Sequence, residues 1–155
     1  MHTLDLERLA NFSDKVRNST LKRLRKVPPG KENYSISNDS MTIADIARHL
    51  IICDEAYLSL LDTKQLEKNL GKTNSIRIKS REEFDNLIRS LEVLKIQRHD
   101  FILAMNDEKL NTKIAVDSIA GKSEEDLGSL IYRMLDHETH HRGALAIYLN
   151  VLNSQ

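Results

Sequence analysis

The sequence predicts an all-α protein whose helices pack as one four-helix bundle, and two observations lead to this prediction. Of the 155 residues, 40% are hydrophobic and 30% are charged, whereas only five are Gly and two are Pro. Such a composition favours long helices over a turn-rich β-architecture. Four segments also repeat apolar residues with helical periodicity. A chain of this length is expected to fold as a single domain over residues 1–155.

The first predicted helix covers residues 4–26 and ends before the sequence PPG at 28–30, because proline breaks helices. Three further helices are predicted over 42–62, 81–105 and 124–152. Each of these three begins near a side chain that can cap a helix, with an acidic residue three positions later. The three pairs are Thr42 and Asp45, Ser80 and Glu83, and Ser123 and Asp126.

The connections between the predicted helices differ in length. The polar stretch 62–80, which contains Gly71, is long enough to cross over an end of the bundle. Residues 28–41 and 106–122 are expected to be ordinary loops.

The overall charge and the single cysteine exclude several classes of protein. The formal net charge is +0 and the isoelectric point is near 7.0, so the chain has no basic field with which to bind nucleic acid. One cysteine, Cys53, cannot form an internal disulfide, and the first residues, MHTLDLERLA, do not resemble a signal peptide. A cytoplasmic protein is expected. No apolar run is long enough to span a membrane.

Residues 137–141 match the pattern H-E-x-x-H, which in other proteins marks the zinc-binding helix of a peptidase. A peptidase would need a third ligand downstream, but the fourteen residues after His141 include no His, Asp, Glu or Cys. His137 and His141 lie one helical turn apart on the same face, so both can reach one metal ion, whereas His140 is expected to face solvent. A third ligand must come from upstream, and periodicity leaves His49 and His99 equally open.

A resemblance decides between these two histidines. The stretches DSMTIADIARHLIICDEAYLSLL (39–61) and LDHETHHRGALAIYL (135–149) resemble the DinB/YfiT-like family of proposed metalloenzymes, and so does LKRLRKVPPGKENY (21–34). The resemblance implies a four-helix bundle with crossover connections and a metal triad formed by His49, His137 and His141, with His99 as the alternative. The family often has Gln after the Arg-Gly pair, where this chain has Ala144.

A site of three neutral imidazoles leaves a divalent cation its full charge and an open position, which suits zinc or nickel. The resemblance implies a thiol-dependent S-transferase in detoxification or stress metabolism, with a small-molecule thiol and an electrophile as substrates. A metal-dependent hydrolase, a non-catalytic metal site closed by Cys53, and a DNA-associated damage-response protein are the alternatives. Gly143 in a helix interior would be explained by close approach of another helix or of a second subunit in a homodimer.

Several neighbours of the histidines are candidate site residues. Glu138 falls inside the apolar arc of its helix, where it either orients an imidazole or transfers a proton, or else forms an ion pair with Arg98. Arg98 can alternatively hold an anionic substrate. Asp54, Tyr57 and Tyr148 are further candidates to line the pocket, and the alternative for the two tyrosines, which the sequence favours, is a core ring with a hydrogen-bonded hydroxyl.

Overall fold

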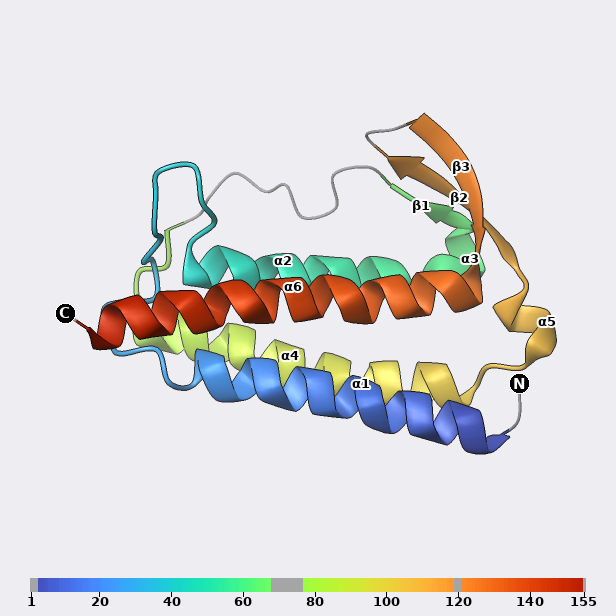
Figure 1. Cartoon of the computed structure of the whole chain (residues 1–155), viewed down its shortest axis with the longest axis horizontal. Helices are drawn as coiled ribbons and strands as arrows, with labels where there is room; N and C mark the ends of the chain where they lie inside the picture. The colour runs from blue at the N-terminus through green and yellow to red at the C-terminus, as the bar shows by residue number, and fades with distance from the viewer. Residues whose placement is uncertain (1–2, 68–76, 119–120, 155) are drawn as a thin grey trace.

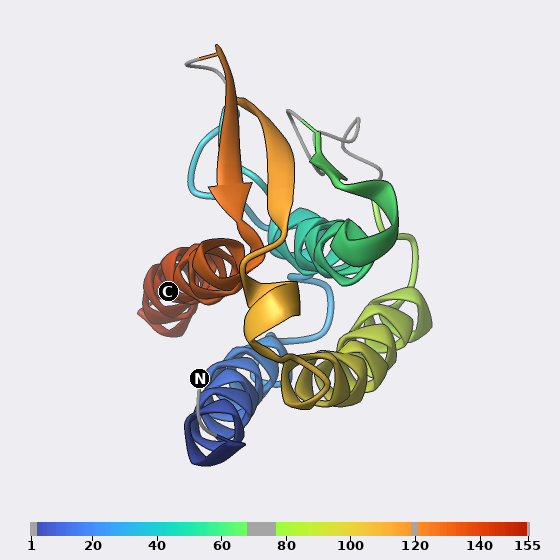
Figure 2. The same cartoon turned by 90° about the vertical axis from the view of Figure 1, so that its right-hand side faces the viewer.

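The computed structural model describes residues 3–67, 77–118 and 121–154, and within these ranges the chain forms six helices and three short strands. The four long helices are α1 (Thr3–Leu24), α2 (Ile43–Leu58), α4 (Arg81–Leu103) and α6 (Leu127–Asn153). They lie side by side along the longest axis of the molecule (Figure 1), and the view along that axis shows α2 beside α6 and α1 beside α4 (Figure 2). None of the described helices is both long and apolar enough to cross a membrane.

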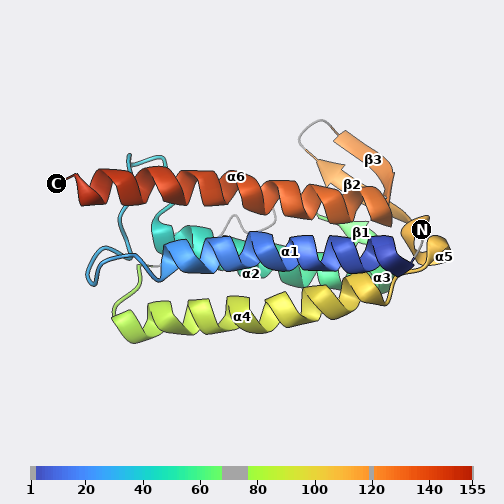
Figure 3. The same cartoon turned by 60° about the horizontal axis from the view of Figure 1, so that its bottom comes forward.

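The long helices run in two directions. α1 and α6 run one way and α2 and α4 run the other, and α1 packs against both α4 and α6 (Figure 3). Because α2 and α4 point in the same direction, the connection from the end of α2 to the start of α4 must run back along the length of these helices. Residues 68–76 of this connection, including Gly71, lie outside the described residues.

The starts of α2 and α4 follow the capping signals in the sequence. The Thr42 hydroxyl accepts a hydrogen bond from the backbone N–H of Asp45, and the Asp45 carboxylate accepts one from the backbone N–H of Thr42. Ser80 caps α4 in the same way through the backbone N–H of Glu83. These contacts satisfy N–H groups that have no partner within the helix, so both predicted start points are confirmed.

The third predicted start point is wrong and the all-α prediction holds only in part, because the described chain is mostly helical but residues 113–126 form a β-hairpin. Strands β2 (Lys113–Ser118) and β3 (Gly121–Asp126) pair in antiparallel register, with Ser123 opposite Val116. β1 (Gln65–Leu66) adds to β2 in parallel. Ser123 therefore lies within a strand, and Asp126 caps α6 by accepting from the backbone N–H of Ser129 at 2.7 Å.

The hairpin forms because alternate residues of β2, Ile114 and Val116, are buried against the ends of the long helices. Two four-residue helices, α3 (Leu60–Thr63) and α5 (Asp107–Leu110), lead into this region. α5 and β2 therefore replace part of the loop predicted over 106–122, and the predicted second helix is broken after Leu58.

The interior contains two apolar clusters with a polar layer between them. The cluster next to the hairpin includes Leu6, Leu9, Tyr57, Ile102, Ile114, Leu127 and Met134, and the cluster at the opposite end includes Leu21, Leu24, Ile43, Leu50, Phe84, Leu91 and Leu145. On each long helix, one buried charged residue falls between the members of the two clusters. These four residues are Arg17, Asp54, Arg98 and Glu138.

Candidate metal centre

Three histidines from two helices meet beside the polar layer. His49 lies on α2, and His137 and His141 lie one turn apart on α6. The Nε2 atom of His137 is 3.0 Å from Nε2 of His49 and 3.1 Å from Nε2 of His141, and the ring centroids of His49 and His141 are 4.8 Å apart. The three imidazoles therefore point their Nε2 atoms toward a common region.

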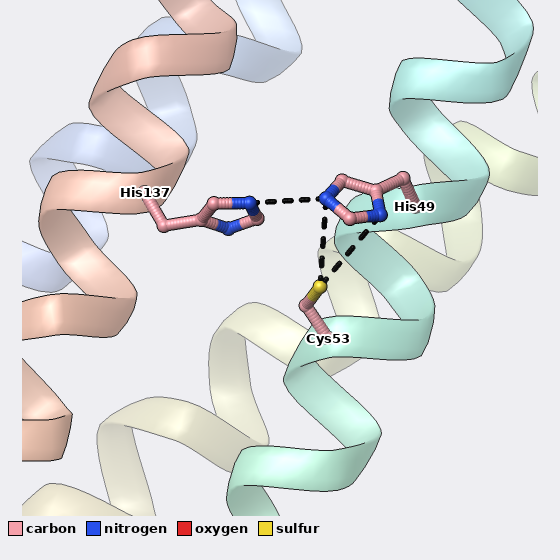
Figure 4. A group of neighbouring side chains, drawn as sticks. All are labelled: His49, Cys53 and His137. Atoms are coloured by element: carbon pink, nitrogen blue, oxygen red, sulfur yellow. Dashed lines mark hydrogen bonds between the residues drawn. The ribbon is translucent and has the colours of Figure 1, made fainter. Parts of the chain in front are cut away.

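A fourth donor lies beside them, since Cys53 follows His49 by one turn on α2. Its Sγ atom is 3.7 Å from Nε2 of His49, and Figure 4 shows that the two side chains lie side by side on α2. One donor atom each from His49, Cys53 and His137 lie within 4.8 Å of one another, so this group could hold a metal ion. Burial raises the pKa of the Cys53 thiol to about 12, and the charge of Asp54 adds to this effect.

His137 and His141 are neutral near neutral pH. Burial, followed by the neighbouring imidazoles, lowers the pKa of His137 to about 4 and that of His141 to about 3. A neutral imidazole is the form that donates an electron pair to a metal. Without a metal, a neutral ring can instead donate its N–H to the ring beside it at these distances.

The donor set fits a divalent transition metal. In a tetrahedral zinc site with bonds of about 2.0–2.1 Å, neighbouring nitrogen ligands are about 3.3 Å apart, close to the two Nε2 separations found here. Imidazole nitrogen and thiol sulfur are ligands that zinc and nickel accept, whereas magnesium and calcium prefer oxygen. The site would therefore need only a small adjustment to hold zinc or nickel.

The four charged residues of the polar layer form one ion-pair network, which we call the buried charge layer. The Glu138 carboxylate accepts from Nε and Nη2 of Arg17 at 2.7 and 3.0 Å, and from Nη1 of Arg98 at 2.5 Å. The Asp54 carboxylate accepts from Arg17 at 2.7 Å and from Arg98 at 3.3 Å. Two arginines thus balance two carboxylates, which buried charges require.

Serine and backbone oxygens accept the remaining donors of the two arginines. Arg98 donates from Nε and Nη2 to the Ser13 hydroxyl, and Arg17 donates from Nη1 to the Leu91 carbonyl. Burial by itself would raise the pKa of Glu138, but the charges of Arg17 and Arg98 outweigh it and lower that pKa to about 2. Glu138 is therefore an ionised partner of both arginines.

The buried charge layer adjoins the candidate metal centre along the sequence. Asp54 follows Cys53 on α2, and Glu138 follows His137 on α6. The inward positions predicted for Arg98 and Glu138 agree with their burial, and the Arg98 side chain has no exposed surface. The ion pair between Glu138 and Arg98, one of the predicted alternatives, is present, and Arg17 is an additional partner of Glu138.

The other predicted site residues lie in different surroundings. Tyr57 is on the same face of α2 as Cys53, whereas Tyr148 donates its hydroxyl to the Met41 carbonyl at 2.9 Å. His99, the alternative ligand, pairs its Nδ1 with the Asp14 carboxylate at 3.0 Å. His140 is exposed, as the helical spacing predicts.

Arg17, which lies on the first helix and is fully buried, was not identified from the sequence as a site residue. A signal was nevertheless present. Ser13, Arg17 and Leu24 follow one another at helical spacings that place all three on the inward face, and all three are buried. An arginine in such a row needs buried acidic partners, which here are Asp54 and Glu138.

Comparisons with known proteins agree with this fold. The model of the DinB family matches residues 1–152. A DinB-like protein (YjoA) from Bacillus subtilis has a similar structure, with a TM-score of 0.70 and 14% identity over 94% of this chain and 92% of that chain. A DinB family protein from Exiguobacterium sibiricum has a TM-score of 0.65 and 17% identity over 97% and 91% of the two chains. The comparison with curated proteins gives no match. The family model covers almost the whole sequence, and this chain belongs to the DinB family.

Proposed function

We propose that this protein is a metal-dependent enzyme that transfers a small thiol to an electrophile, with zinc or nickel held by His49, His137 and His141. In this proposal the four long helices act as a four-helix bundle that carries the site at the junction of α2 and α6. The thiol S-transferase activity would serve detoxification or stress metabolism.

The observation that carries the proposal is the convergence of three imidazole nitrogens without a carboxylate among them. Neutral ligands do not offset the charge of a divalent cation, and three of them leave a tetrahedral coordination sphere incomplete. A metal held there would lower the pKa of a thiol or of water bound at the remaining position, so either could act as a nucleophile near neutral pH.

The protein residues supply position and charge balance. His49 approaches from α2, and His137 and His141 from α6, so the relative placement of these two helices sets the spacing of the donors. The buried charge layer ties the same two helices together through Asp54 and Glu138. The site is therefore built on rigid elements, which favours a defined geometry.

A second candidate function rests on Cys53. Its sulfur lies 3.7 Å from Nε2 of His49, close enough that a small side-chain movement could add it to the coordination sphere. Four protein ligands would close the site, and closed sites of this kind are structural. In that case the metal would join α2 to α6 without taking part in a reaction.

Cobalt substitution separates the two functions. A sulfur ligand to Co²⁺ gives an intense charge-transfer absorption band. For a structural site we expect this band in the protein alone and its loss in Cys53→Ala. For a transferase we expect the Cys53→Ala protein to show the band only after a small thiol is added, and chelation to abolish the thiol transfer. His140→Ala, which removes an exposed imidazole, is the matched control.

The same preparation tests the hydrolase alternative. If no thiol produces the band while a panel of esters and amides is cleaved in a metal-dependent manner, hydrolysis replaces thiol transfer as the function. Measurement of the molar mass in solution tests the proposed homodimer. No atom lies within 4 Å of a Cβ built on Gly143, so close packing within the described part of the chain does not account for that glycine.

A further inference from the structure

The candidate metal centre continues toward the hairpin along both helices that form it. α2 and α6 run in opposite directions, and His49 and Cys53 of α2 lie opposite the histidines of α6. Tyr57 follows Cys53 by four residues on α2, and Arg133 precedes His137 by four residues on α6. Residues four apart lie on the same helix face, so Tyr57 lies one turn beyond Cys53 on α2 and Arg133 lies one turn before His137 on α6.

The hydroxyl of Tyr57 makes no hydrogen bond within the described part of the chain. The residue is only 6% exposed, but its hydroxyl oxygen is not among the buried polar atoms that lack a partner, so that oxygen reaches solvent. Burial raises its pKa to about 12, and the charges of Arg133, Cys53 and Glu125 act on the same hydroxyl. The phenol is therefore a neutral donor at physiological pH, within electrostatic range of the thiol of Cys53 and the guanidinium of Arg133.

Arg133 already holds one carboxylate. Its Nη1 donates to Oε1 of Glu125, at the end of β3, over 2.7 Å. A guanidinium has five N–H donors, and Arg133 makes no other hydrogen bond within the described part of the chain. The two side chains are 44% and 33% exposed, and ion pairs this exposed to solvent contribute little to stability. A second carboxylate can therefore replace Glu125 at little cost, and it can bind in the bidentate manner that arginine favours.

We propose that Arg133 and Tyr57 form a subsite for the carboxylate of the small thiol, with Glu125 occupying Arg133 until that carboxylate arrives. This subsite rests on the proposed function, because the sulfur of the same molecule would face the three histidines. It restricts the substrate class to thiols that carry a carboxylate a few bonds from the sulfur. An uncharged thiol of the same size lacks the group that Arg133 recognises.

The test compares 3-mercaptopropionate with 3-mercaptopropionamide, which differ only in the charge of the terminal group. Their dissociation constants are measured from the charge-transfer band of the cobalt-loaded Cys53→Ala protein. We expect the carboxylate thiol to bind more tightly, Arg133→Gln to weaken it about tenfold, and the amide to be unaffected by that change. Tyr57→Phe, which keeps the ring, should reduce the preference by a smaller factor.

Glu125→Gln gives the deciding contrast. It removes the competing carboxylate, so we expect it to strengthen binding of 3-mercaptopropionate, opposite to the effect of Arg133→Gln. Arg89→Gln, which removes an exposed arginine of α4, is the control for net charge. An equal preference for the two thiols, or weaker binding in both Glu125→Gln and Arg133→Gln, would overturn the subsite.

A thiol-free measurement keeps the subsite distinct from the transferase function. With ¹⁵N-labelled arginine, we expect propionate, but not propionamide, to shift the Nε–Hε resonance of Arg133, and Glu125→Gln to lower the propionate concentration required. If neither thiol binds the metal while propionate produces this shift, the transferase function fails and the subsite stands. If the thiols bind without a carboxylate preference and propionate produces no shift, the function stands and the subsite is overturned.

Discussion

Replacing Glu138 by Gln removes one charge from the buried charge layer and leaves two arginines with one carboxylate. Glu138 accepts three hydrogen bonds, two from Arg17 and one from Arg98, and its side chain is almost completely buried. Glutamine has nearly the same shape, so the change leaves no cavity. The expected effect is therefore electrostatic.

Two independent arguments give the magnitude. The arginines lower the pKa of Glu138 from 4.5 to about 2, a difference equivalent to about 3 kcal/mol in favour of the ionised carboxyl group. Removing one partner of a buried ion pair destabilises proteins by about 3–5 kcal/mol, because the remaining charge stays buried. We expect Glu138→Gln to lower the free energy of unfolding by about 3–5 kcal/mol, a large part of the roughly 5–15 kcal/mol typical of a domain.

The assay is urea unfolding of the metal-free protein at neutral pH, with the slope m checked so that only a change of midpoint is counted. Glu124→Gln, at an exposed position of β3, is the matched control and should change stability by less than about 0.5 kcal/mol. Combining Glu138→Met with Arg98→Met should recover part of the loss, since it removes opposite charges together. A loss below about 1 kcal/mol in Glu138→Gln would refute the reasoning.

The pH dependence of this effect has a defined sign. A carboxyl group with a lowered pKa stabilises the folded state above its unfolded pKa, and this contribution is lost as the pH falls through the folded value. The stability difference between the wild type and Glu138→Gln should therefore be full above about pH 4.5 and shrink as the pH approaches 2. A difference that grows toward low pH would contradict the assignment of an ionised Glu138.

Three further predictions concern the histidines and a helix cap. We expect His49→Ala and His137→Ala each to reduce zinc affinity by more than about a hundredfold, measured in competition with a chromophoric chelator. His140→Ala should leave the zinc affinity unchanged. Loss of affinity in His140→Ala with full affinity in the other two variants would exclude the proposed ligand set. Because the folded pKa values of His137 and His141 are lowered to about 4 and 3, the unfolded chain binds more protons below about pH 6.5. The metal-free protein should therefore lose stability as the pH falls from 6.5 toward 4, and His137→Asn should make that slope shallower. Thr42→Ala removes the cap of α2 and should lower the free energy of unfolding by about 1 kcal/mol in denaturant titrations. An unchanged free energy of unfolding would mean that another group replaces the Thr42 cap.

Local spacing in the sequence determined the long helices and the faces that they bury. The caps at Thr42 and Ser80, the helical spacing of His137 and His141, and the inward positions of Arg98 and Glu138 are all properties of single helices. Each can be predicted because the geometry within one helix is fixed by its periodicity. The same reasoning failed for residues 113–126, where pairing between two strands and burial of one strand outweighed a pattern that matches a helix cap.

Only the tertiary structure decided which side chains meet across helices. It places His49 within 3.0 Å of His137, pairs His99 with Asp14 instead, and brings Arg17 to Glu138 over 121 positions of sequence. Periodicity gives the direction of each side chain about its own helix axis, but not the distance between two axes or the offset between their turns. Those quantities depend on how both apolar clusters and the buried charge layer pack together, and no stretch of sequence contains that information by itself.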